Sequence, residues 1–243
     1  MSTNKIVIKK CCGLKQISDI EFILANNDTF KYTHLGIILV PNKARSFPLE
    51  NSSTLKSLVE SYGKQINIVG VFQKQSFDEI DKIVSESALP LTHIQIHDSA
   101  SDWFETILLL QRKHPNLKYI KRFVFPKDCE LLNELINTDT FSKQLPELRS
   151  KLHILFDSEK GGNGELQDWR GINAFLNKTI SDDDSKNFKI IIAGGLTPEN
   201  VAACINQIEK INGVDVSGGL ENKEQVGVKN RKKVEIFAKS SDF

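Results

Sequence analysis

Several side chains that could transfer protons or bind anions stand at or just after the ends of short apolar runs. These candidates are Cys12, Arg45, Gln95, His97 and Asp157. A carboxyl group and a thiol that meet around a bound substrate can act as general acid and general base. Each also has an ordinary structural explanation, because a cysteine at a strand end often serves as a small buried hydrophobe and an aspartate often forms a turn. Their chemistry therefore depends on whether the fold brings them together.

Two glycine pairs near the C-terminus could bind an anion. Gly194-Gly195 follows the apolar run 190–193, and Gly218-Gly219 follows the run 214–216. Without a Cβ, glycine lets backbone N–H groups approach an anion closely. One such pair is more often a simple chain turn, but two pairs on neighbouring parallel strands would form one cup for a phosphate. We therefore expect a phosphate site here.

The segment between the glycine pairs carries helix-start signals. Thr197 is a plausible N-cap, Pro198 suits the first helical position, and Glu199 suits the positive end of the helix dipole. Strand, glycine turn, helix, strand and glycine turn together predict a βαβ unit.

The rest of the chain repeats this alternation. We expect strands at 5–12, 34–40, 66–72, 91–97, 118–125, 153–156, 190–193 and 214–216. Helices are expected at 19–25, 52–63, 77–87, 99–114, 128–137, 168–178 and 230–239, besides the one that starts near residue 198. Ser18 should cap the first helix, and Ser76 with Glu79 forms a capping box. No compositional break divides the chain, so a single (β/α)8 TIM barrel domain over residues 1–243 fits better than two domains.

A barrel would place the candidate residues at one rim. Residues at the C-terminal ends of barrel strands line the active face, and phosphate often binds after strands seven and eight. Strands one and six flank that pair in the ring. Cys12 and Asp157 should therefore face each other across the mouth, with the phosphate cup between them.

Composition limits the class of protein. The 243 residues carry a formal net charge of +1, which argues against a general nucleic-acid binder. No apolar run approaches the roughly 18 residues of a membrane span, and the N-terminus has no signal-peptide pattern. Cys11, Cys12, Cys129 and Cys204 form no CxxC pair, so we expect reduced thiols, no metal site and a cytoplasmic location. No apolar stretch demands a partner, so we expect a monomer.

The motifs around these residues resemble the phosphoribosylanthranilate isomerases, in particular the monofunctional fungal forms, over nearly the whole chain. The resemblance rests on the stretches 10–14 (KCCGL), 35–45 (LGIILVPNKAR), 95–97 (QIH), 155–158 (LFDS), 161–164 (GGNG), 168–169 (DW), 193–201 (AGGLTPENV) and 213–219 (GVDVSGG). Taken together these motifs are specific, although a lone AGGL or DVS would not be.

The resemblance implies a cofactor-free Amadori rearrangement in tryptophan biosynthesis, with a small-molecule substrate, phosphoribosylanthranilate. It implies Asp157 as general acid and Cys12 as general base. Arg45 would hold the anthranilate carboxylate, and Asp215 would point into the mouth. The remaining substrate-binding positions, at the phosphate, would be Gly162, Gly194, Gly195, Ser217 and Gly218.

These roles require shifted pKa values, because an ordinary Asp is ionised and an ordinary Cys is a thiol at pH 7. Burial would raise the pKa of Asp157, and a nearby cation could lower that of Cys12. Lys10 is close in sequence, but neighbours on a strand point to opposite sides, so we do not assign it as this cation.

The chain departs from the family pattern at three positions. Cys11 replaces an aliphatic residue, and we expect it to face the helix layer because strand side chains alternate. Asp98 replaces a glycine, which leaves the role of the fourth loop open. Gly218 replaces a serine, which a backbone contact to phosphate would tolerate.

Two other functions fit parts of the pattern. A sugar-phosphate epimerase would share the barrel and the phosphate cup, but would need metal-ligating His and Asp residues on several strand ends, where only His97 stands out. A non-enzymatic barrel could keep the cup as a binding module, although the presence of both Cys12 and Asp157 argues against it.

Overall fold

In the computed structural model, eight parallel strands form one closed barrel in the order β1 to β8, as the sequence predicts. The structure describes residues 6–63, 66–98, 102–137, 148, 150–158, 166–181 and 189–241. The strands are β1 (Ile8–Cys11), β2 (His34–Ile38), β3 (Asn67–Phe72), β4 (His93–Ile96), β5 (Lys118–Phe123), β6 (Leu152–Phe156), β7 (Ile190–Ile192) and β8 (Gly213–Val216). Strand β1 pairs with both β2 and β8, which closes the ring.

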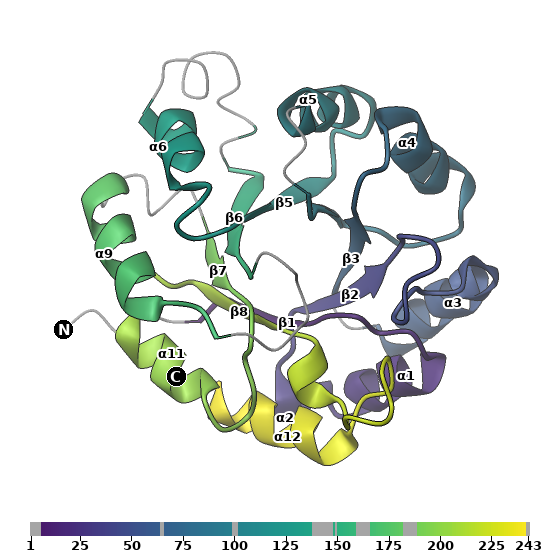
Figure 1. The fold of residues 1–243 in the computed structure, drawn as a ribbon. Coiled ribbons are helices and arrows are strands. Elements are labelled where there is room, and N and C mark those ends of the chain that lie inside the picture. Colours follow the sequence, from purple (N-terminus) through teal and green to yellow (C-terminus); the bar gives the residue numbers. More distant parts are fainter. Residues whose placement is uncertain are drawn as a thin grey trace.

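Helices surround this ring on the outside (Figure 1). They are α1 (Ile17–Ala25), α2 (Asn27–Phe30), α3 (Ser52–Tyr62), α4 (Phe77–Glu86), α5 (Trp103–Lys113), α6 (Cys129–Asn137), α9 (Trp169–Thr179), α11 (Val201–Gln207) and α12 (Arg231–Ser240). Two short 3₁₀ helices, η1 (Leu49–Asn51) and η2 (Gly218–Leu220), lie in the loops after β2 and β8. Within the described ranges, no helix is both long and apolar enough to cross a membrane.

Local signals account for several helix ends. The Ser76 side chain accepts a hydrogen bond from the Glu79 N–H, and the Glu79 carboxylate accepts one from the Ser76 N–H, which confirms the capping box at α4. The Asp168 and Asn230 side chains cap α9 and α12 by accepting a single hydrogen bond, from the Gly171 N–H and the Lys233 N–H respectively. Gly63 ends α3 in the left-handed conformation, where a side chain would be strained.

Two expected helix starts are wrong. Helix α1 begins at Ile17, because the backbone of Gln16 accepts the first-turn hydrogen bonds, so Ser18 lies inside the helix rather than at its cap. Helix α11 begins at Val201, not at Pro198. The Asn200 carboxamide accepts from the Thr197 N–H and donates to the Gly195 carbonyl, which holds residues 197–200 as a turn.

The barrel separates two hydrophobic layers. Side chains between the strands and the helices form the larger core, and a smaller cluster fills the barrel interior with Ile8, Val69, Ile120, Leu155, Ile191 and Ala193. Strand β1 shows the alternation clearly: the Lys9 Nζ donates to helix-layer carbonyls of Phe30 and Ala238, whereas the Lys10 Nζ binds Asp215. Successive residues of one strand therefore serve different layers.

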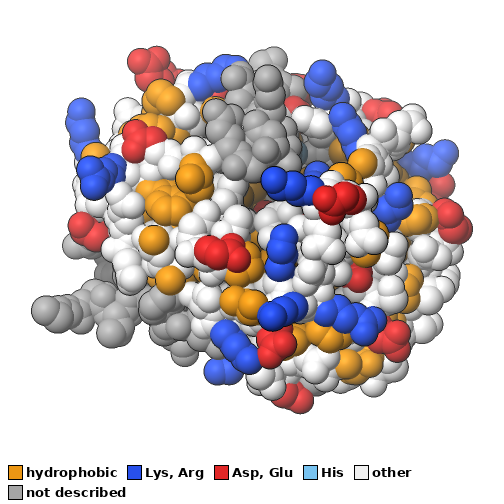
Figure 2. Space-filling view, turned by 60° about the horizontal axis from the view of Figure 1, so that its bottom comes forward, with side chains coloured by type: hydrophobic (Ala, Val, Ile, Leu, Met, Phe, Trp, Pro, Cys, Tyr) orange, Lys and Arg blue, Asp and Glu red, His pale blue; other side chains and the backbone are white. Residues whose placement is uncertain are grey.

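Charged side chains of both signs are interspersed over the face drawn in Figure 2. This face shows no extended patch of a single sign, in line with the formal net charge of +1. Extended basic patches are the usual feature of proteins that bind nucleic-acid backbones. The expectation that the chain does not bind nucleic acid stays a prediction.

Three buried histidines pack together at the N-terminal ends of alternate strands. They are His34 (β2), His93 (β4) and His153 (β6), and the His93 ring contacts the other two. The ring centroids are 4.8 Å apart for His34 and His93 and 5.9 Å apart for His93 and His153. Burial is the largest cause that lowers their pKa values, to about 2, 3 and 4 respectively, and the charge of Lys118 adds to it in all three. Repulsion from neighbouring histidines adds to it for His34 and His93. They are therefore neutral in the folded protein at pH 7.

This cluster predicts acid sensitivity. The pKa of His93 is about 3 in the folded protein and 6.5 in the unfolded chain. The folded protein therefore keeps its full stability above about pH 6.5 and loses stability as the pH falls from there toward 3, because only the unfolded chain binds the proton. Between the unfolded-state pKa and pH 5, each such histidine lowers the free energy of unfolding by about 1.4 kcal/mol per pH unit, which gives a loss of about 2 kcal/mol at pH 5. We expect His93→Gln, which cannot be protonated, to reduce the loss between pH 7 and pH 5 by about that amount. Denaturant unfolding at both pH values measures it, and an unchanged pH dependence in the variant would contradict it.

Candidate active site

A cavity of about 730 Å³ opens at the C-terminal ends of the barrel strands. Its wall contains all the sequence-predicted site residues that the structure describes: Cys12, Arg45, Asp157, Gly194, Gly195, Asp215, Ser217 and Gly218. Gln95 and His97 line it as well. Gly162 and the glycine-rich motif around it lie outside the described residues. The fold thus brings residues from both halves of the sequence to one cavity.

Cys12 follows β1 directly and its side chain points into the barrel. The Cys12 N–H donates to the Val216 carbonyl at 2.8 Å, which extends the β1–β8 pairing by one residue. A Cβ placed on Gly36 of β2 would lie 2.7 Å from the Cys12 Sγ and 3.1 Å from the Lys10 Cε, so this glycine leaves room for both side chains. The cavity wall at this point therefore requires a residue without a side chain.

Cys11 and Cys12 face opposite layers, as expected from strand alternation. Cys11 is fully buried among side chains that pack between strands and helices, whereas Cys12 lines the cavity. Burial raises the pKa of the Cys11 thiol to about 12. Only one of the two adjacent thiols can therefore meet a molecule in the cavity.

Lys10 lies beside Cys12, and the expectation that it points away is wrong. The two residues are two positions apart, so strand alternation puts them on the same face; Cys11 is the neighbour that points away. The Lys10 Nζ donates to the Asp215 Oδ2 at 2.6 Å, and both side chains are buried. Burial disfavours the charged amine, but Asp215 and Cys12 raise its pKa above the ordinary value, so Lys10 stays charged.

Opposing effects act on the Cys12 thiol. Burial raises its pKa, Lys10 opposes that shift through its charge and a hydrogen bond, and Asp215 adds to it. The pKa stays above its ordinary value, contrary to the lowering we expected. The cation that the sequence could not identify is present, but desolvation outweighs it in the free protein.

Asp157 stands directly after β6 at the rim of the cavity and is almost completely buried. Its Oδ1 accepts a hydrogen bond from the Ser158 N–H at 2.7 Å. Burial raises its pKa to about 6, assisted by the negative charge of Asp215, while the Ser158 hydrogen bond and the positive charges of Arg122 and Lys10 act in the opposite direction. The carboxyl group is thus much easier to protonate near neutral pH than an ordinary aspartate.

His97 lies across from Asp157, with 3.7 Å between the His97 Nε2 and the Asp157 Oδ2. Burial and the charge of Arg122 lower the pKa of His97 to about 3, so its ring is neutral at pH 7. This distance is also longer than a hydrogen bond. The neutral His97 ring is therefore a polar neighbour of the Asp157 carboxyl group, and the two do not form an ion pair.

The two glycine turns lie against each other, as the sequence predicts. Gly194 and Gly195 have φ values of +77° and +65°, in the region that favours glycine. A Cβ on Gly219 would lie 1.9 Å from the Leu196 carbonyl oxygen, so only glycine lets the turn after β8 pack on the turn after β7. Both turns line the cavity.

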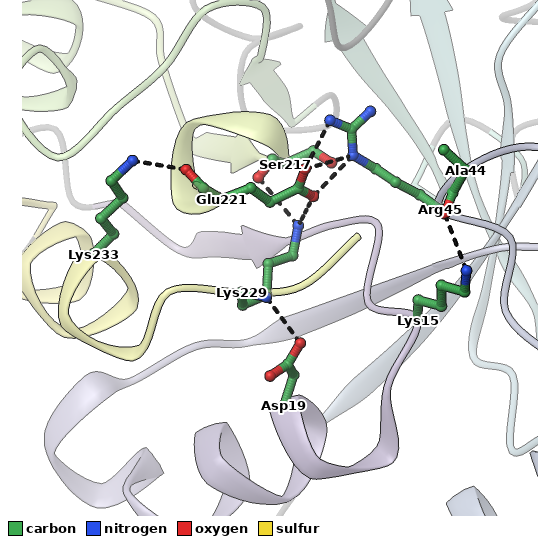
Figure 3. Close-up of polar contacts among 8 residues, drawn as sticks. All are labelled: Lys15, Asp19, Ala44, Arg45, Ser217, Glu221, Lys229 and Lys233. Carbon is green, nitrogen blue, oxygen red and sulfur yellow. Dashed lines mark hydrogen bonds and ion pairs between the residues drawn. The ribbon is translucent and has the colours of Figure 1, made fainter. Parts of the chain in front are cut away.

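Arg45 is held by a residue that the sequence did not identify. Its Nε and Nη2 donate to the Glu221 carboxylate at 2.8 Å each, and Lys229 donates to the same carboxylate at 2.9 Å (Figure 3). Lys10 had a sequence signal, since it stands two positions before Cys12. Glu221 and Lys229 had none, because 176 residues separate Glu221 from Arg45.

The described residues contain no group of three or more His, Cys, Asp or Glu side chains arranged to hold a metal ion. The chemistry that these side chains can perform is proton transfer by a carboxyl group and a thiol, next to two glycine turns and a guanidinium. A closed (β/α)8 barrel that carries these groups at the C-terminal ends of its strands is typical of an enzyme that acts on a small anionic molecule.

Comparison with known proteins identifies the family. Residues 9–240 match the family model described as N-(5'phosphoribosyl)anthranilate (PRA) isomerase. The chain belongs to this family, and this assignment favours an isomerase over the epimerase and the binding module that the sequence left open.

The relatives include fungal enzymes. The N-(5'-phosphoribosyl)anthranilate isomerase of Saccharomyces cerevisiae is 34% identical over 239 residues, covering 96% of this chain and 93% of that protein. The isomerase of Candida albicans is 30% identical and covers 95% of each chain. Among solved structures, phosphoribosyl anthranilate isomerase from Thermotoga maritima has a TM-score of 0.71 at 21% identity, with coverage of 97% and 98%. A phosphoribosyl anthranilate isomerase in complex with reduced 1-(o-carboxyphenylamino)-1-deoxyribulose 5-phosphate has a TM-score of 0.70 at 20% identity, with the same coverage. These two similarities support the fold.

The buried pair of Lys10 and Asp215 gives a prediction about stability. Lys10→Met should lower the free energy of unfolding by about 3–5 kcal/mol, because it leaves the Asp215 carboxylate buried without its partner. Adding Asp215→Asn in the same chain should restore part of this loss, since the unpaired charge is then removed. Denaturant unfolding of the three variants measures both effects. Equal and additive losses in the two single variants would contradict a coupled pair.

Proposed function

We propose that the chain catalyses the Amadori rearrangement of N-(5'-phosphoribosyl)anthranilate to 1-(2-carboxyphenylamino)-1-deoxyribulose 5-phosphate in tryptophan biosynthesis. The observation that carries the proposal is that Cys12 and Asp157 line one cavity together with the glycine turns and Arg45. An acid, a base and two anion-binding groups are what this reaction needs. No step of the proposed reaction uses a cofactor.

Asp157 serves as the general acid in this proposal. It donates its proton to the ring oxygen of the ribose while the C1–O bond breaks, and the nitrogen lone pair forms the C=N bond of a Schiff base. A pKa of about 6 supports the role, since an effective acid has a pKa near the operating pH. The neutral His97 opposite does not compete by forming a salt bridge with the carboxylate.

Cys12 serves as the general base. Its thiolate removes the proton from C2 of the sugar, and the electron pair moves through C1 to the nitrogen to give an enolamine, which then tautomerises to the ketone. Lys10 supports this role by stabilising the thiolate when it forms. Burial keeps the thiol protonated in the free protein, so the productive form pairs a protonated Asp157 with a deprotonated Cys12.

The two ends of the substrate are both anionic. Backbone N–H groups of the turns at Gly194, Gly195, Ser217 and Gly218 would hold the phosphate, and Gly162 stays a predicted contributor. Arg45 would hold the anthranilate carboxylate, to which its planar guanidinium is suited. Asp215, whose Oδ1 is buried and has no hydrogen-bond partner among the described residues, would accept a hydrogen bond from a sugar hydroxyl. The cytoplasmic location and the monomeric state stay predictions.

The test of the reaction is turnover of N-(5'-phosphoribosyl)anthranilate by the purified protein, followed by the loss of anthranilate-type fluorescence. We expect turnover in buffer treated with a chelator, because the proposed chemistry uses only protein side chains. A protein that folds but does not convert this substrate would refute the assignment.

Asp157→Asn tests the acid. The variant keeps the size and polarity of the side chain but has no acidic proton, so we expect kcat to fall by at least about 10²-fold, as is typical for loss of a general acid. The thermal midpoint and the affinity for inorganic phosphate should change little. If Asp157 only stabilises the loop after β6, the same variant would lose stability and keep its kcat.

Cys12→Ala tests the base, with Cys11→Ala as its matched control. We expect the Cys12 variant to lose turnover by about 10²-fold or more while it still binds substrate, because only that thiol reaches the cavity. The Cys11 variant should lose stability through a cavity in the core and keep its kcat. An active Cys12→Ala protein would exclude Cys12 as the base.

A further inference from the structure

The guanidinium of Arg45 is fixed along one edge by Glu221. The Arg45 Nε lies 2.8 Å from the Glu221 Oε1 and 3.0 Å from the Oε2, and the Arg45 Nη2 lies 2.8 Å from the Oε2. This two-point contact, shown in Figure 3, restricts both the position and the plane of the guanidinium. Arg45 comes from the loop after β2, and Glu221 directly follows η2.

Lys229 holds Glu221 from the other side (Figure 3). Its Nζ donates to the Glu221 Oε1 at 2.9 Å and to the Ser217 carbonyl at 3.1 Å. Its backbone N–H donates to the Asp19 Oδ2 at 2.9 Å, which ties the segment to α1. Burial opposes ionisation of Glu221, but the hydrogen bond from Arg45 and the charge of Lys229 keep its pKa below the ordinary value.

The opposite edge of Arg45 remains available to the cavity. The Nη1 has no hydrogen bond to any residue that the structure describes, and the Arg45 side chain lines the cavity with 20% of its surface exposed. The Glu221 and Lys229 side chains are only 3% and 1% exposed. A Cβ on Gly13 would lie 2.9 Å from the Arg45 Cδ, so this glycine leaves space for the stem of the arginine.

The charges of the cluster also matter. Arg45 and Glu221 alone would sum to zero, and the carboxylate of Glu221 would repel a second anion close to the guanidinium. Lys229 offsets that negative charge from the buried side, so the three groups together keep one positive charge. The free edge of Arg45 is the part of the cluster that lines the cavity, where a substrate anion would meet it.

We propose that Glu221 is a positioning residue for the substrate carboxylate: it aims the free edge of Arg45 into the cavity, and Lys229 keeps the cluster positive. This inference rests on the proposed function, in which Arg45 binds the anthranilate carboxylate. Glu221 itself touches no reacting atom. It sets the direction and the distance of the Arg45 contact.

Glu221→Gln separates positioning from simple charge. If only charge mattered, removal of a negative group beside the anchor would strengthen binding of an anion and lower KM. Positioning predicts the opposite, because the amide nitrogen of glutamine cannot accept from Arg45 and the guanidinium loses one of its two contacts. We expect KM for N-(5'-phosphoribosyl)anthranilate to rise at least about tenfold, with kcat within about threefold of the unchanged protein. An unchanged or lower KM would overturn the proposal.

Two further variants control for stability and for the change in charge. Glu235→Gln makes the same substitution on the surface of α12, where Glu235 pairs only with Lys239 among the described residues, and should leave KM unchanged. Glu221→Asp keeps the carboxylate but shortens its reach, and should give a KM between those of the Gln variant and the unchanged protein. The Asp variant replaces the Gln variant in every measurement if the latter fails to fold. Because Glu221→Asp keeps the negative charge, a rise in its KM at an unchanged thermal midpoint comes from altered geometry and supports positioning, whereas an unchanged KM would count against it.

A double-mutant cycle with Arg45→Ala distinguishes failure of this inference from failure of the proposed function. Arg45→Ala should raise KM strongly, and Glu221→Gln should then add less than about twofold, because Glu221 acts through Arg45. If Arg45→Ala leaves KM unchanged, the carboxylate anchor of the proposed function is wrong. If Arg45→Ala raises KM and the effect of Glu221→Gln is fully additive, only the positioning role is wrong.

Competitive inhibition by two fragments locates the effect. Anthranilate carries only the carboxylate end of the substrate, and ribose 5-phosphate carries only the phosphate end. We expect Glu221→Gln to weaken inhibition by anthranilate about tenfold and to leave inhibition by ribose 5-phosphate within twofold. Equal weakening of both would show that Glu221 acts on the phosphate turn through Lys229 and Ser217, and would overturn the assignment to Arg45.

Discussion

The ion pair between Lys10 and Asp215 is the interaction on which the site depends most. It joins β1 to β8, the strands that close the barrel, and it lies inside the wall of the cavity. A buried ion pair is costly to desolvate, and it is tolerated here because each charge satisfies the other. Its placement has a chemical consequence: Lys10 is the cation beside Cys12, and the Asp215 charge helps to raise the pKa of Asp157. Each member of the pair favours one proposed role and opposes the other: Asp215 raises the pKa of Asp157 and Lys10 lowers it, while Lys10 lowers the pKa of Cys12 and Asp215 raises it.

Glycines determine how closely the walls of the cavity can approach. Gly36 makes room for the Cys12 and Lys10 side chains, and Gly219 lets the turn after β8 touch the turn after β7. A methyl group at either position would push apart the groups that a small substrate must contact together. The same reasoning explains why a glycine pair after each of two strands is a weak signal alone and supports a single proposed phosphate site only when the strands are neighbours, as β7 and β8 are.

The two proposed anion anchors are linked through the protein itself. Lys229 contacts both Glu221, which holds Arg45, and the carbonyl of Ser217 in the phosphate turn. The spacing between the carboxylate anchor and the phosphate anchor is therefore set by a buried network rather than by two independent loops. A rigid spacing favours a substrate with two anionic ends at a fixed separation, because less conformational entropy is lost on binding.

Much of the architecture was determined by the sequence alone. Alternating apolar runs and helical segments predicted the eight-stranded barrel, and strand ends predicted which residues meet at its mouth, because both depend on local periodicity and on the topology of parallel strands. The start of α11 was decided instead by the Asn200 side chain, which holds a turn where local propensity favours a helix. The Glu221–Arg45 contact and the raised pKa of Cys12 also came only from the tertiary structure. Hydrogen bonds between distant residues and desolvation depend on what surrounds a group in space, and no spacing along the chain encodes them.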